Sequence, residues 1–402
     1  MKTIRILKFL TAVTALVAML PVACRGPMTV DNSGLPFGGG NPNVPTQSPI
    51  KHLIVVVMQN RSFDHLFGQF QPGNGQTVDG LRPGVPGFTQ TDANGNSFSP
   101  FLLTNGSSDD LAHGHNDYLE SWNHGAMDGF VLAQKTDVVM GYFDASIPGI
   151  STLWDYARQF ALSDRYYSSV LSSAPAQMFY AVSATDNGQP FSTQPVFGPC
   201  QSPDPAAYEN TARNVGDQMS SRDIGWAWFH ERLGACGDYV PQQNPFQYFT
   251  TTHNSEHIQD LSAFTTVLDA GQLPSVSFVQ PAPSHSGHPG SSSITAGITW
   301  LDGFVKQVQA SSSWDTSAIV VLWDEGGGWY DHSPPPQVDS EGLGIRVPML
   351  VISPFAKKGV VVHELMDHTS LLKFIQWNWG LPALNGRNSI GSISDLRPMF
   401  AF

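Results

Sequence analysis

The sequence predicts an α/β protein, a three-layer α/β/α sandwich with a largely parallel central sheet. Four short apolar runs carry this prediction: Leu53–Met58, Val276–Val279, Ile319–Trp323 and Val347–Ile352. Continuous runs rich in β-branched residues, without polar alternation, are typical of strands that are buried on both faces. Helical patterns between the runs and polar residues directly after them complete the prediction.

The remaining elements follow in chain order. Asn94 and Gly95, within "TQTDANGNSF", predict a hairpin turn. A helix between the second and third runs is indicated by apolar residues three and four apart, at Ile298, Leu301, Val305 and Val308. The stretch "DHTSLLKFIQWNWGLP" predicts another helix, which begins near Asp367 or Thr369 and ends at Gly380. Strand, helix and strand in this order make right-handed crossover units.

The first segment is not expected to belong to the fold. Residues 1–24 combine a basic start, an apolar segment from Phe9 to Leu20 and small residues before Cys24, as a secretory signal peptide does. Small residues ahead of a cysteine also resemble a bacterial lipoprotein cleavage site, which would lipidate Cys24 and tether the protein to a membrane. Plain secretion is the alternative. Either outcome predicts an extracytoplasmic protein: a membrane-anchored lipoprotein, or a periplasmic or secreted one.

The rest of the chain is expected to form one catalytic domain. Residues 25–49 are rich in Gly, Pro and Asn and predict a flexible tether, and residues 50–402 contain no comparable linker. A loop-rich insertion is expected at about 190–248. It contains Cys200 and Cys236, which predict one disulfide in an oxidising compartment, with two buried thiols as the alternative.

Composition excludes one class of partner. The 402 residues are 41% hydrophobic and 13% charged, which is enough apolar material for a large core. The formal net charge is −13. A nucleic-acid backbone would be repelled, and an anionic lipid surface would not attract the chain. A zwitterionic or small soluble substrate is compatible with this charge.

The ligand site of an open α/β sheet lies beyond the carboxyl ends of its strands. Polar residues follow three of the apolar runs: Gln59 and Asn60, His285 and His288, and Asp324 and Glu325. Asp331 and His332 come shortly after the third run, beyond three glycines. We therefore expect these side chains to converge on one polar site.

Asp324 and Glu325 are adjacent acids at the end of an apolar run, and they repel each other unless a cation neutralises them. A divalent metal is one explanation, and a solvated acidic turn is the other. Gln59 and Asn60 would add oxygen donors, although Asn after a strand is often a turn residue. His113 and His115, in "DLAHGHND", suit a metal site, phosphate contacts or helix caps.

Several ordered motifs resemble one family. "QNRSFDHLFG" resembles the signature of the bacterial phospholipase C and acid phosphatase phosphoesterases, a branch of the alkaline-phosphatase-like fold. "WNHGAMDGFV", "ALSDRYYSSVL", "WDEGGGWYDHSPPP" and "RVPMLVISPFAKKGVV" are similar to further blocks of that family, in the same order. The resemblance covers about Ile50 to Leu381. It implies an alkaline-phosphatase-like α/β sandwich and a hydrolase that acts on phosphoric esters.

The resemblance also implies the roles of individual residues. One divalent metal ion would be held by Gln59, Asn60, Asp324 and Glu325. Oxygen and histidine donors suit Ca²⁺, Mn²⁺, Fe or Zn²⁺. The nucleophile would be Ser173, two residues before Pro175 in "VLSSAPAQMFY".

The histidines would bind phosphate or protonate the leaving group. The residues implied are His113, His288 and His332 together with Asp331, while His115 and His285 are additional phosphate-binding candidates. The proton donor is expected to be His288 or His332.

Three positions depart from the family pattern. Gln59 replaces the usual Glu, Glu325 replaces a second Asp, and Ala176-Gln177 replaces an Asn-Arg pair after the proline. The metal site therefore carries less negative charge, and Ser172 is an alternative position for the nucleophile.

The sequence thus predicts an extracytoplasmic, metal-dependent phosphoester hydrolase that acts through a phosphoseryl intermediate. Phospholipase C-type cleavage of phosphodiesters is placed ahead of phosphomonoesterase action, and the expected substrate is a phospholipid or a small phosphoester. A sulfatase is disfavoured because Gln177 stands where that group needs Arg. A non-catalytic surface lipoprotein that binds metal or phosphate is the alternative from another class.

Overall fold

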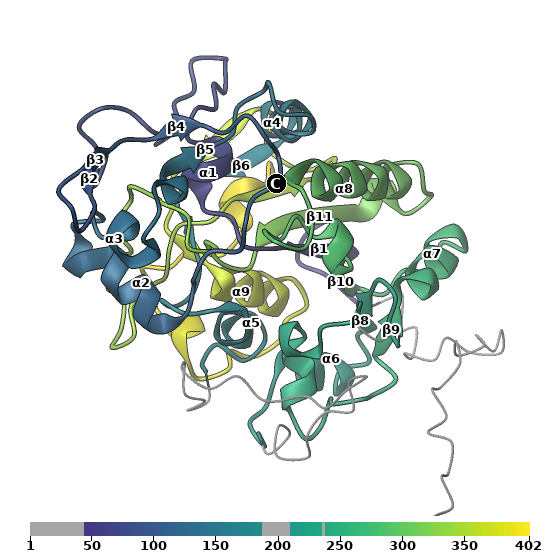
Figure 1. Cartoon of the computed structure of the whole chain (residues 1–402). Helices are drawn as coiled ribbons and strands as arrows, with labels where there is room; N and C mark the ends of the chain where they lie inside the picture. The colour runs from purple at the N-terminus through teal and green to yellow at the C-terminus, as the bar shows by residue number, and fades with distance from the viewer. Residues whose placement is uncertain (1–43, 187–209, 235–237) are drawn as a thin grey trace, which may run out of the picture.

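The computed structural model describes residues 44–186, 210–234 and 238–402 (Figure 1). The predicted signal peptide, the lipidation site at Cys24 and both cysteines of the predicted disulfide, Cys200 and Cys236, lie outside the described residues.

An eight-stranded sheet forms the centre of the molecule. Its strands, in spatial order, are β13 (Val360–Val362), β6 (Ala161–Ser163), β12 (Met349–Ile352), β11 (Ser317–Trp323), β1 (His52–Met58), β10 (Val276–Gln280), β8 (Trp226–His230) and β9 (Ile258–Asp260). Every neighbouring pair is parallel except the two that include β12. The expected largely parallel sheet is confirmed.

Strand β1 lies between β11 and β10, with Leu53 paired to Ala318 on one side and to Val276 on the other. All of its residues from Leu53 to Met58 are buried. A strand that is covered on both faces needs apolar side chains on both, which explains why its sequence does not alternate.

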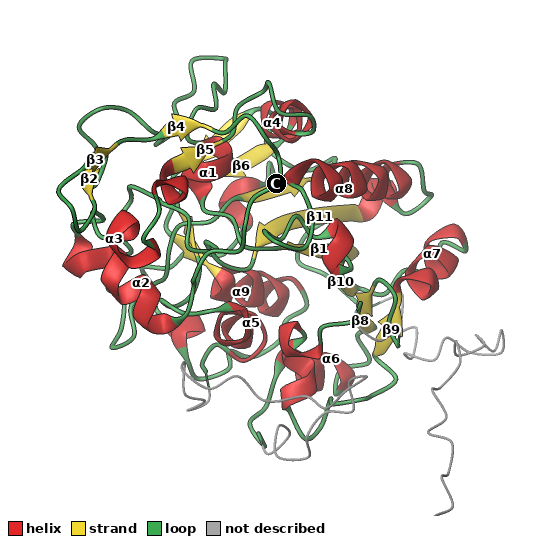
Figure 2. Ribbon diagram, viewed as in Figure 1, coloured by secondary structure: helices red, strands yellow, loops and turns green. Residues whose placement is uncertain are grey.

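Helices cover both faces of the sheet and complete the three layers (Figures 1 and 2). The helices on one face are α4 (Ile150–Gln159), α7 (Leu261–Asp269) and α8 (Ile294–Gln309), and those on the other are α5 (Ala174–Ser183), α6 (Val215–Ser220) and α9 (His368–Asn378). The Tyr156 hydroxyl donates to Asp302 Oδ1 at 2.8 Å and joins α4 to α8. The two predicted helices are α8 and α9, and Asp367 caps α9 by accepting from the Thr369 N–H.

A smaller lobe lies beside the sheet (Figure 1). It contains α2 (His115–Trp122), α3 (Phe130–Gln134), and the paired strands β2 (Gln90–Thr91) with β3 (Ser97–Phe98) and β4 (Phe101–Leu102) with β5 (Gly141–Tyr142). The predicted hairpin is the β2–β3 turn, where Gly95 adopts a φ of 85°. Tyr118, Phe130 and Trp329 belong to a second hydrophobic core inside this lobe.

The remaining α-helix and strands of the described residues are short. Helix α1 (Phe63–Phe67) follows β1 directly, and Ser62 caps it by accepting from the His65 N–H. Strands β7 (Tyr166–Tyr167) and β14 (Met366–Asp367) form a separate parallel pair.

The predicted insertion at about 190–248 differs from the structure, because it includes β8, a fully buried strand of the main sheet. Its sequence, WAWFH, has large aromatic side chains rather than a β-branched run, and aromatic residues also occur in loops. The boundary of the predicted tether at 49 also differs. Gln47 and Ser48 are already hydrogen-bonded to Asn378.

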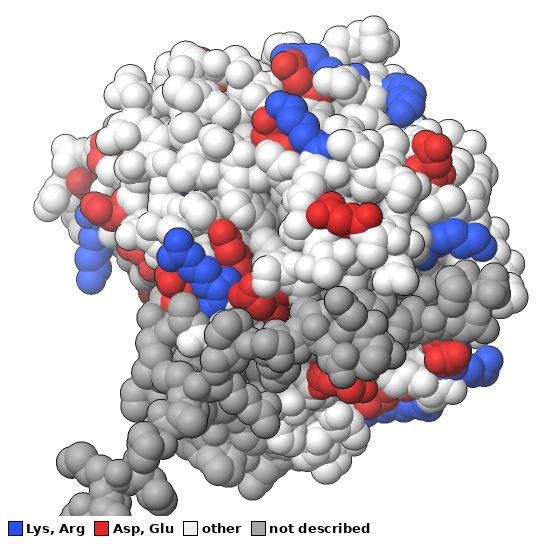
Figure 3. All heavy atoms as spheres, turned by 90° about the vertical axis from the view of Figure 1, so that its right-hand side faces the viewer, with Lys and Arg blue, Asp and Glu red and all other residues white. Residues whose placement is uncertain are grey.

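On the face drawn in Figure 3, charged side chains are sparse, and Lys and Arg lie among Asp and Glu and are separated by uncharged residues. Among the described residues, no helix is both long and apolar enough to cross a membrane.

Candidate active site

The ends of β1 and β11 bring four of the predicted metal ligands close together, because these two strands are parallel neighbours. The backbone N–H of Asn60 donates to Asp324 Oδ1 at 2.9 Å, and its side-chain amide donates to Glu325 Oε1 at 2.9 Å. Asn60 has a φ of 59°, a conformation that Asn adopts more readily than most residues. Gln59, its neighbour in sequence, is also buried.

The two acids are buried and lie in a low-dielectric environment. Burial, and then the neighbouring Glu325, raise the pKa of Asp324 to about 8. Burial likewise raises the pKa of Glu325. Glu325 Oε2 accepts hydrogen bonds from the Tyr118 hydroxyl and from the Gly327 N–H. A carboxyl pair held in this way favours either a proton or a bound cation.

The oxygen donors fit a metal ion. Asn60 Oδ1 is buried and has no hydrogen-bond partner among the described residues. A buried carbonyl oxygen without a partner is costly unless a cation or a water satisfies it. Asn60, Asp324 and Glu325 therefore offer a set of oxygen ligands typical of hard divalent cations. The buried amide nitrogen of Gln59 also has no partner among these residues, and such a donor suits an anionic oxygen.

The glycines after the acids permit a close approach of backbone segments. Gly327 has a φ of +62°, and a Cβ there would clash with the carbonyl of Asn60. Gly328 has a φ of +75°, and its Cβ would lie 2.7 Å from the Ala112 carbonyl oxygen. Because these two glycines have no Cβ, the Asn60 and Ala112 segments can lie close to the acid pair.

His113 lies directly against this set. Its Nε2 is 3.5 Å from Glu325 Oε1 and 3.3 Å from Asn60 Nδ2, and its Nδ1 is 2.6 Å from the Leu111 carbonyl oxygen. Burial opposes protonation of His113, but Glu325 and the Leu111 carbonyl outweigh it and raise the pKa above its ordinary value.

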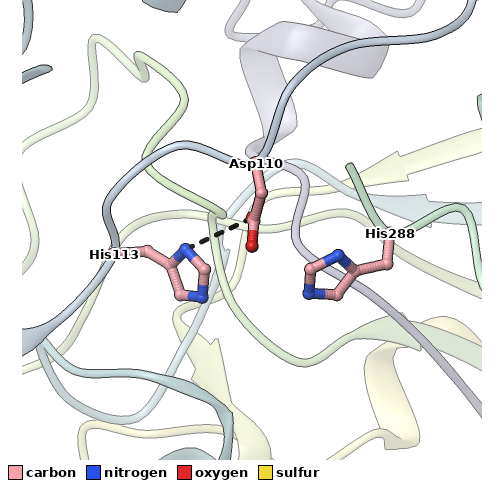
Figure 4. Close-up of side chains that lie close together, drawn as sticks. All are labelled: Asp110, His113 and His288. Carbon is pink, nitrogen blue, oxygen red and sulfur yellow. Dashed lines mark ion pairs between the residues drawn. The ribbon is translucent and has the colours of Figure 1, made fainter. Parts of the chain in front are cut away.

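His288 faces His113 across Asp110 (Figure 4). The two imidazole centroids are 6.2 Å apart, and ligand atoms of the three residues all lie within 4.8 Å of one another. His288 Nδ1 is 2.6 Å from the Pro289 carbonyl oxygen. A proton on Nδ1 of His288 leaves its Nε2 for a ligand or substrate, whereas His113 Nε2 already contacts Asn60 and Glu325.

Ser173 precedes helix α5 as its N-cap residue, and 8% of its surface is exposed. The turn before it is held by Gln177, whose Oε1 accepts from Val170 N at 3.0 Å and whose Nε2 donates to the Ser172 carbonyl at 2.7 Å. Gln177 stands where the family pattern has Arg, and its side-chain amide fixes the backbone before Ser173 through these two hydrogen bonds.

Helix α2 joins the serine turn to the acid pair. His115 Nδ1 lies 2.6 Å from the Leu171 carbonyl oxygen, and Tyr118 hydrogen-bonds to Glu325. Residues three apart lie on the same face of a helix. One helical face therefore contacts both the segment before Ser173 and the metal-binding candidates.

His332 and Asp331 belong to a second, buried network. His332 Nδ1 lies 2.6 Å from Asp64 Oδ2, and its Nε2 lies 3.2 Å from Asp79 Oδ1. Arg346 Nη2 donates to Asp64 at 3.0 Å, and its Nε donates to Asp331 at 3.1 Å. Both ring nitrogens of His332 thus face carboxylates of the chain itself.

His285 lies on the loop after β10, and its Nδ1 is 2.9 Å from both carboxylate oxygens of Glu231. Sequence reasoning did not include Glu231, Asp110, Tyr118 or Arg346 in the site. Helical spacing from His115 could have indicated Tyr118. Arg346 and Glu231 are remote in sequence from the residues they bind, and no local pattern identifies them.

Comparison with known proteins identifies the family of this chain. The model of the Phosphoesterase family matches residues 50–382. Phospholipase C B of Mycobacterium tuberculosis is 26% identical over 84% of this chain and 74% of its own length. The non-hemolytic phospholipase C of Pseudomonas aeruginosa is 26% identical over 83% of this chain, which spans about half (54%) of that relative. Non-specific phospholipase C1 of Arabidopsis thaliana is 25% identical over 79% of this chain and 63% of its own length.

Solved structures show more distant likeness. The lipoteichoic acid synthase LtaP of Listeria monocytogenes has a TM-score of 0.47 at 9% identity, over 92% of this chain and 78% of its own. A Vibrio parahaemolyticus protein described as a member of the alkaline phosphatase superfamily has a TM-score of 0.42 at 10% identity, over 91% and 76%. Because the family model spans most of the sequence, this phosphoester hydrolase belongs to the Phosphoesterase family.

Proposed function

We propose that the protein is an extracytoplasmic, metal-dependent phospholipase C-type phosphodiesterase that acts through a phosphoserine at Ser173. The observation that carries this proposal is the buried set of oxygen donors at Asn60, Asp324 and Glu325, with His113 against it. The relatives named phospholipase C support diester cleavage.

Asp324, Glu325 and Asn60 would hold one divalent metal ion, and the family resemblance adds Gln59. Oxygen and imidazole donors suit Ca²⁺, Mn²⁺, Fe or Zn²⁺. When bound, the metal would supply electrostatic stabilisation of the serine alkoxide and of the phosphoryl oxygens.

The chain's own groups would position the reaction. Ser173 stands at the N-terminal end of α5, where the helix dipole favours an anionic oxygen. Nε2 of His288 would contact the phosphoryl oxygens, since its Nδ1 is bonded to a backbone carbonyl, and His113 would lie beside them through its contact with Glu325. We assign His332 and Asp331 a structural role, because their polar atoms are engaged by Asp64, Asp79 and Arg346.

The proposed substrates are phospholipids or small phosphodiesters. The net charge of −13 favours a zwitterionic headgroup over an anionic surface. The proposed location outside the cytoplasm, and a possible membrane tether through Cys24, are supported by the signal-like first 24 residues.

The first test replaces the nucleophile. We expect Ser173→Ala to lower turnover of p-nitrophenylphosphorylcholine by about 10³-fold or more, without loss of the folded state, because the variant lacks the proposed nucleophile. Hydrolysis is followed by absorbance with and without chelator, and folding is followed by circular dichroism.

Ser172→Ala is the matched control and should retain activity. Activity that is lost in Ser172→Ala but kept in Ser173→Ala would move the nucleophile by one residue. Faster hydrolysis of p-nitrophenyl phosphate than of the diester would favour a phosphomonoesterase, and a sulfate ester serves as the control for a sulfatase. Turnover that persists after metal removal would contradict metal dependence.

A further inference from the structure

Glu231 is held firmly at the carboxyl edge of the sheet. It follows β8 directly, and its backbone N–H donates to the carbonyl of Gln280, the last residue of β10, at 3.0 Å. Its Oε2 also accepts from the Ala282 N–H at 3.0 Å. A carboxylate that is fixed by two backbone segments has little freedom to turn away from its third partner.

That third partner is His285. Both carboxylate oxygens of Glu231 lie 2.9 Å from His285 Nδ1, and the side chains are 19% and 37% exposed, respectively. A carboxylate in contact with Nδ1 keeps the proton there and fixes the orientation of the ring. The opposite nitrogen, Nε2, then remains for a substrate.

The loop that carries His285 is part of the proposed active site. The carbonyl of Ser286, the next residue, accepts from the backbone N–H of Gln59 at 3.3 Å. The Ser286 hydroxyl accepts from the N–H of His288 at 3.2 Å. His285 is thus one residue from a backbone contact with the metal-binding candidates.

The partners of the histidines distinguish their chemistry. His288 directs Nδ1 to a neutral backbone carbonyl. Both nitrogens of His113 lie within 3.7 Å of a carboxylate, Nδ1 of Asp110 and Nε2 of the metal-ligand candidate Glu325, and both nitrogens of His332 also face carboxylates. His285 pairs one nitrogen with a carboxylate and carries the other on a partly exposed ring. A carboxylate that stabilises the imidazolium while one N–H faces the substrate is the arrangement of a general acid–base histidine.

We propose that His285 protonates the leaving alcohol and that Glu231 is its positioning residue. This rests on the proposed function. As the Ser173 alkoxide oxygen bonds to phosphorus, the bond from phosphorus to the leaving oxygen breaks, and that oxygen keeps the electron pair and takes the proton from Nε2. Water then attacks phosphorus and returns a proton to Nε2, while the Ser173 oxygen leaves with the electron pair of its bond.

The test compares two phosphorylcholine diesters that differ in leaving group. An alkoxide leaving group needs a proton, whereas p-nitrophenolate leaves without one. We expect Glu231→Gln to lower kcat/KM on phosphatidylcholine in detergent micelles by about 10–100-fold. Its kcat/KM on p-nitrophenylphosphorylcholine, which does not include the hydrolysis of the phosphoserine, should stay within about twofold of the wild type. His285→Gln should give the same pattern, and its partly exposed side chain keeps the test valid if Glu231→Gln fails to fold.

Glu256→Gln, at an exposed glutamate, is the matched control and should leave both rates unchanged. Equal losses on both substrates, or no loss on either, would overturn the role of His285. A wild-type protein that hydrolyses neither ester would overturn the proposed function, and this inference with it.

Discussion

Gln59 changes the charge of the proposed metal site by one unit relative to the family signature, which has Glu at this position. A neutral amide binds a hard cation more weakly than a carboxylate does. The proposed site therefore carries one negative charge fewer than the family signature implies.

Restoring the carboxylate should therefore strengthen metal binding. We expect Gln59→Glu to tighten the affinity for the activating divalent cation by about tenfold, since an added carboxylate ligand contributes about 1–2 kcal/mol. Titration calorimetry on metal-depleted protein measures this change, with the exposed Gln272→Glu as control. Unchanged or weaker affinity would remove Gln59 from the ligand set.

The sequence predicted contacts between residues at the ends of neighbouring strands. It did not predict contacts that the pairing of strands does not imply. Asn60 meets Asp324 and Glu325 because parallel neighbouring strands end at the same edge. His332 was assigned to the same site because it follows the same strand. Its partner Asp64 is 268 residues away in sequence, and nothing local indicates that pairing.

At the scale of elements, the buried Arg346 hydrogen-bonds to four separate segments of the chain. It donates to Asp64 of α1, to Asp331 and to the backbone carbonyls of Asp79 and Asp164. A guanidinium satisfies several acceptors at once, and breaking such a buried network costs about 3–5 kcal/mol. These contacts fix α1 relative to the loop after β11.

His332 should make the stability of this network depend on pH. Burial lowers its pKa, but Asp64 raises it more, to about 9, compared with 6.5 in the unfolded chain. The protonated histidine therefore stabilises the fold fully below pH 6.5, and this contribution is lost as the pH rises through about 9. His332→Asn should cost about 3 kcal/mol at pH 6 and much less at pH 10.

Urea denaturation at several pH values measures this difference. The exposed His124, whose φ of 55° suits Asn, provides the control substitution His124→Asn. A destabilisation that stays constant with pH would show that His332 is not charged in the folded protein.

The sequence predicted the strands that consist of aliphatic residues and missed a strand that is rich in aromatic residues. The aliphatic runs identified β1, β10, β11 and β12, yet their direction could not be read from composition. Strand β12 is antiparallel to both neighbours although its sequence, MLVI, resembles the others. Strand β8 was missed because its aromatic sequence is not specific to strands.

At the scale of the whole molecule, the proposed metal should also stabilise the fold. Without a cation, Asp324 and Glu325 are buried beside each other, and their charges repel. A ligand at 100 times its Kd adds about 2.7 kcal/mol to the free energy of unfolding, which for a chain of this size raises Tm by about 4 °C.

Differential scanning calorimetry of chelator-treated protein, before and after readdition of a divalent cation, tests this expectation at pH 8. The Asp324→Asn variant should show no such rise, because it lacks one of the ligands. A wild-type Tm that does not respond to any divalent cation would contradict the proposed site.

Helix α2 has a consequence for anyone who wishes to engineer this enzyme. Because helix α2 contacts the serine turn through His115 and Glu325 through Tyr118, substitution of either residue would disturb the proposed nucleophile and the proposed metal site together. Libraries that aim at new headgroups should leave these two codons untouched. The exposed Leu119, which borders a surface hollow, is the safer choice for diversification.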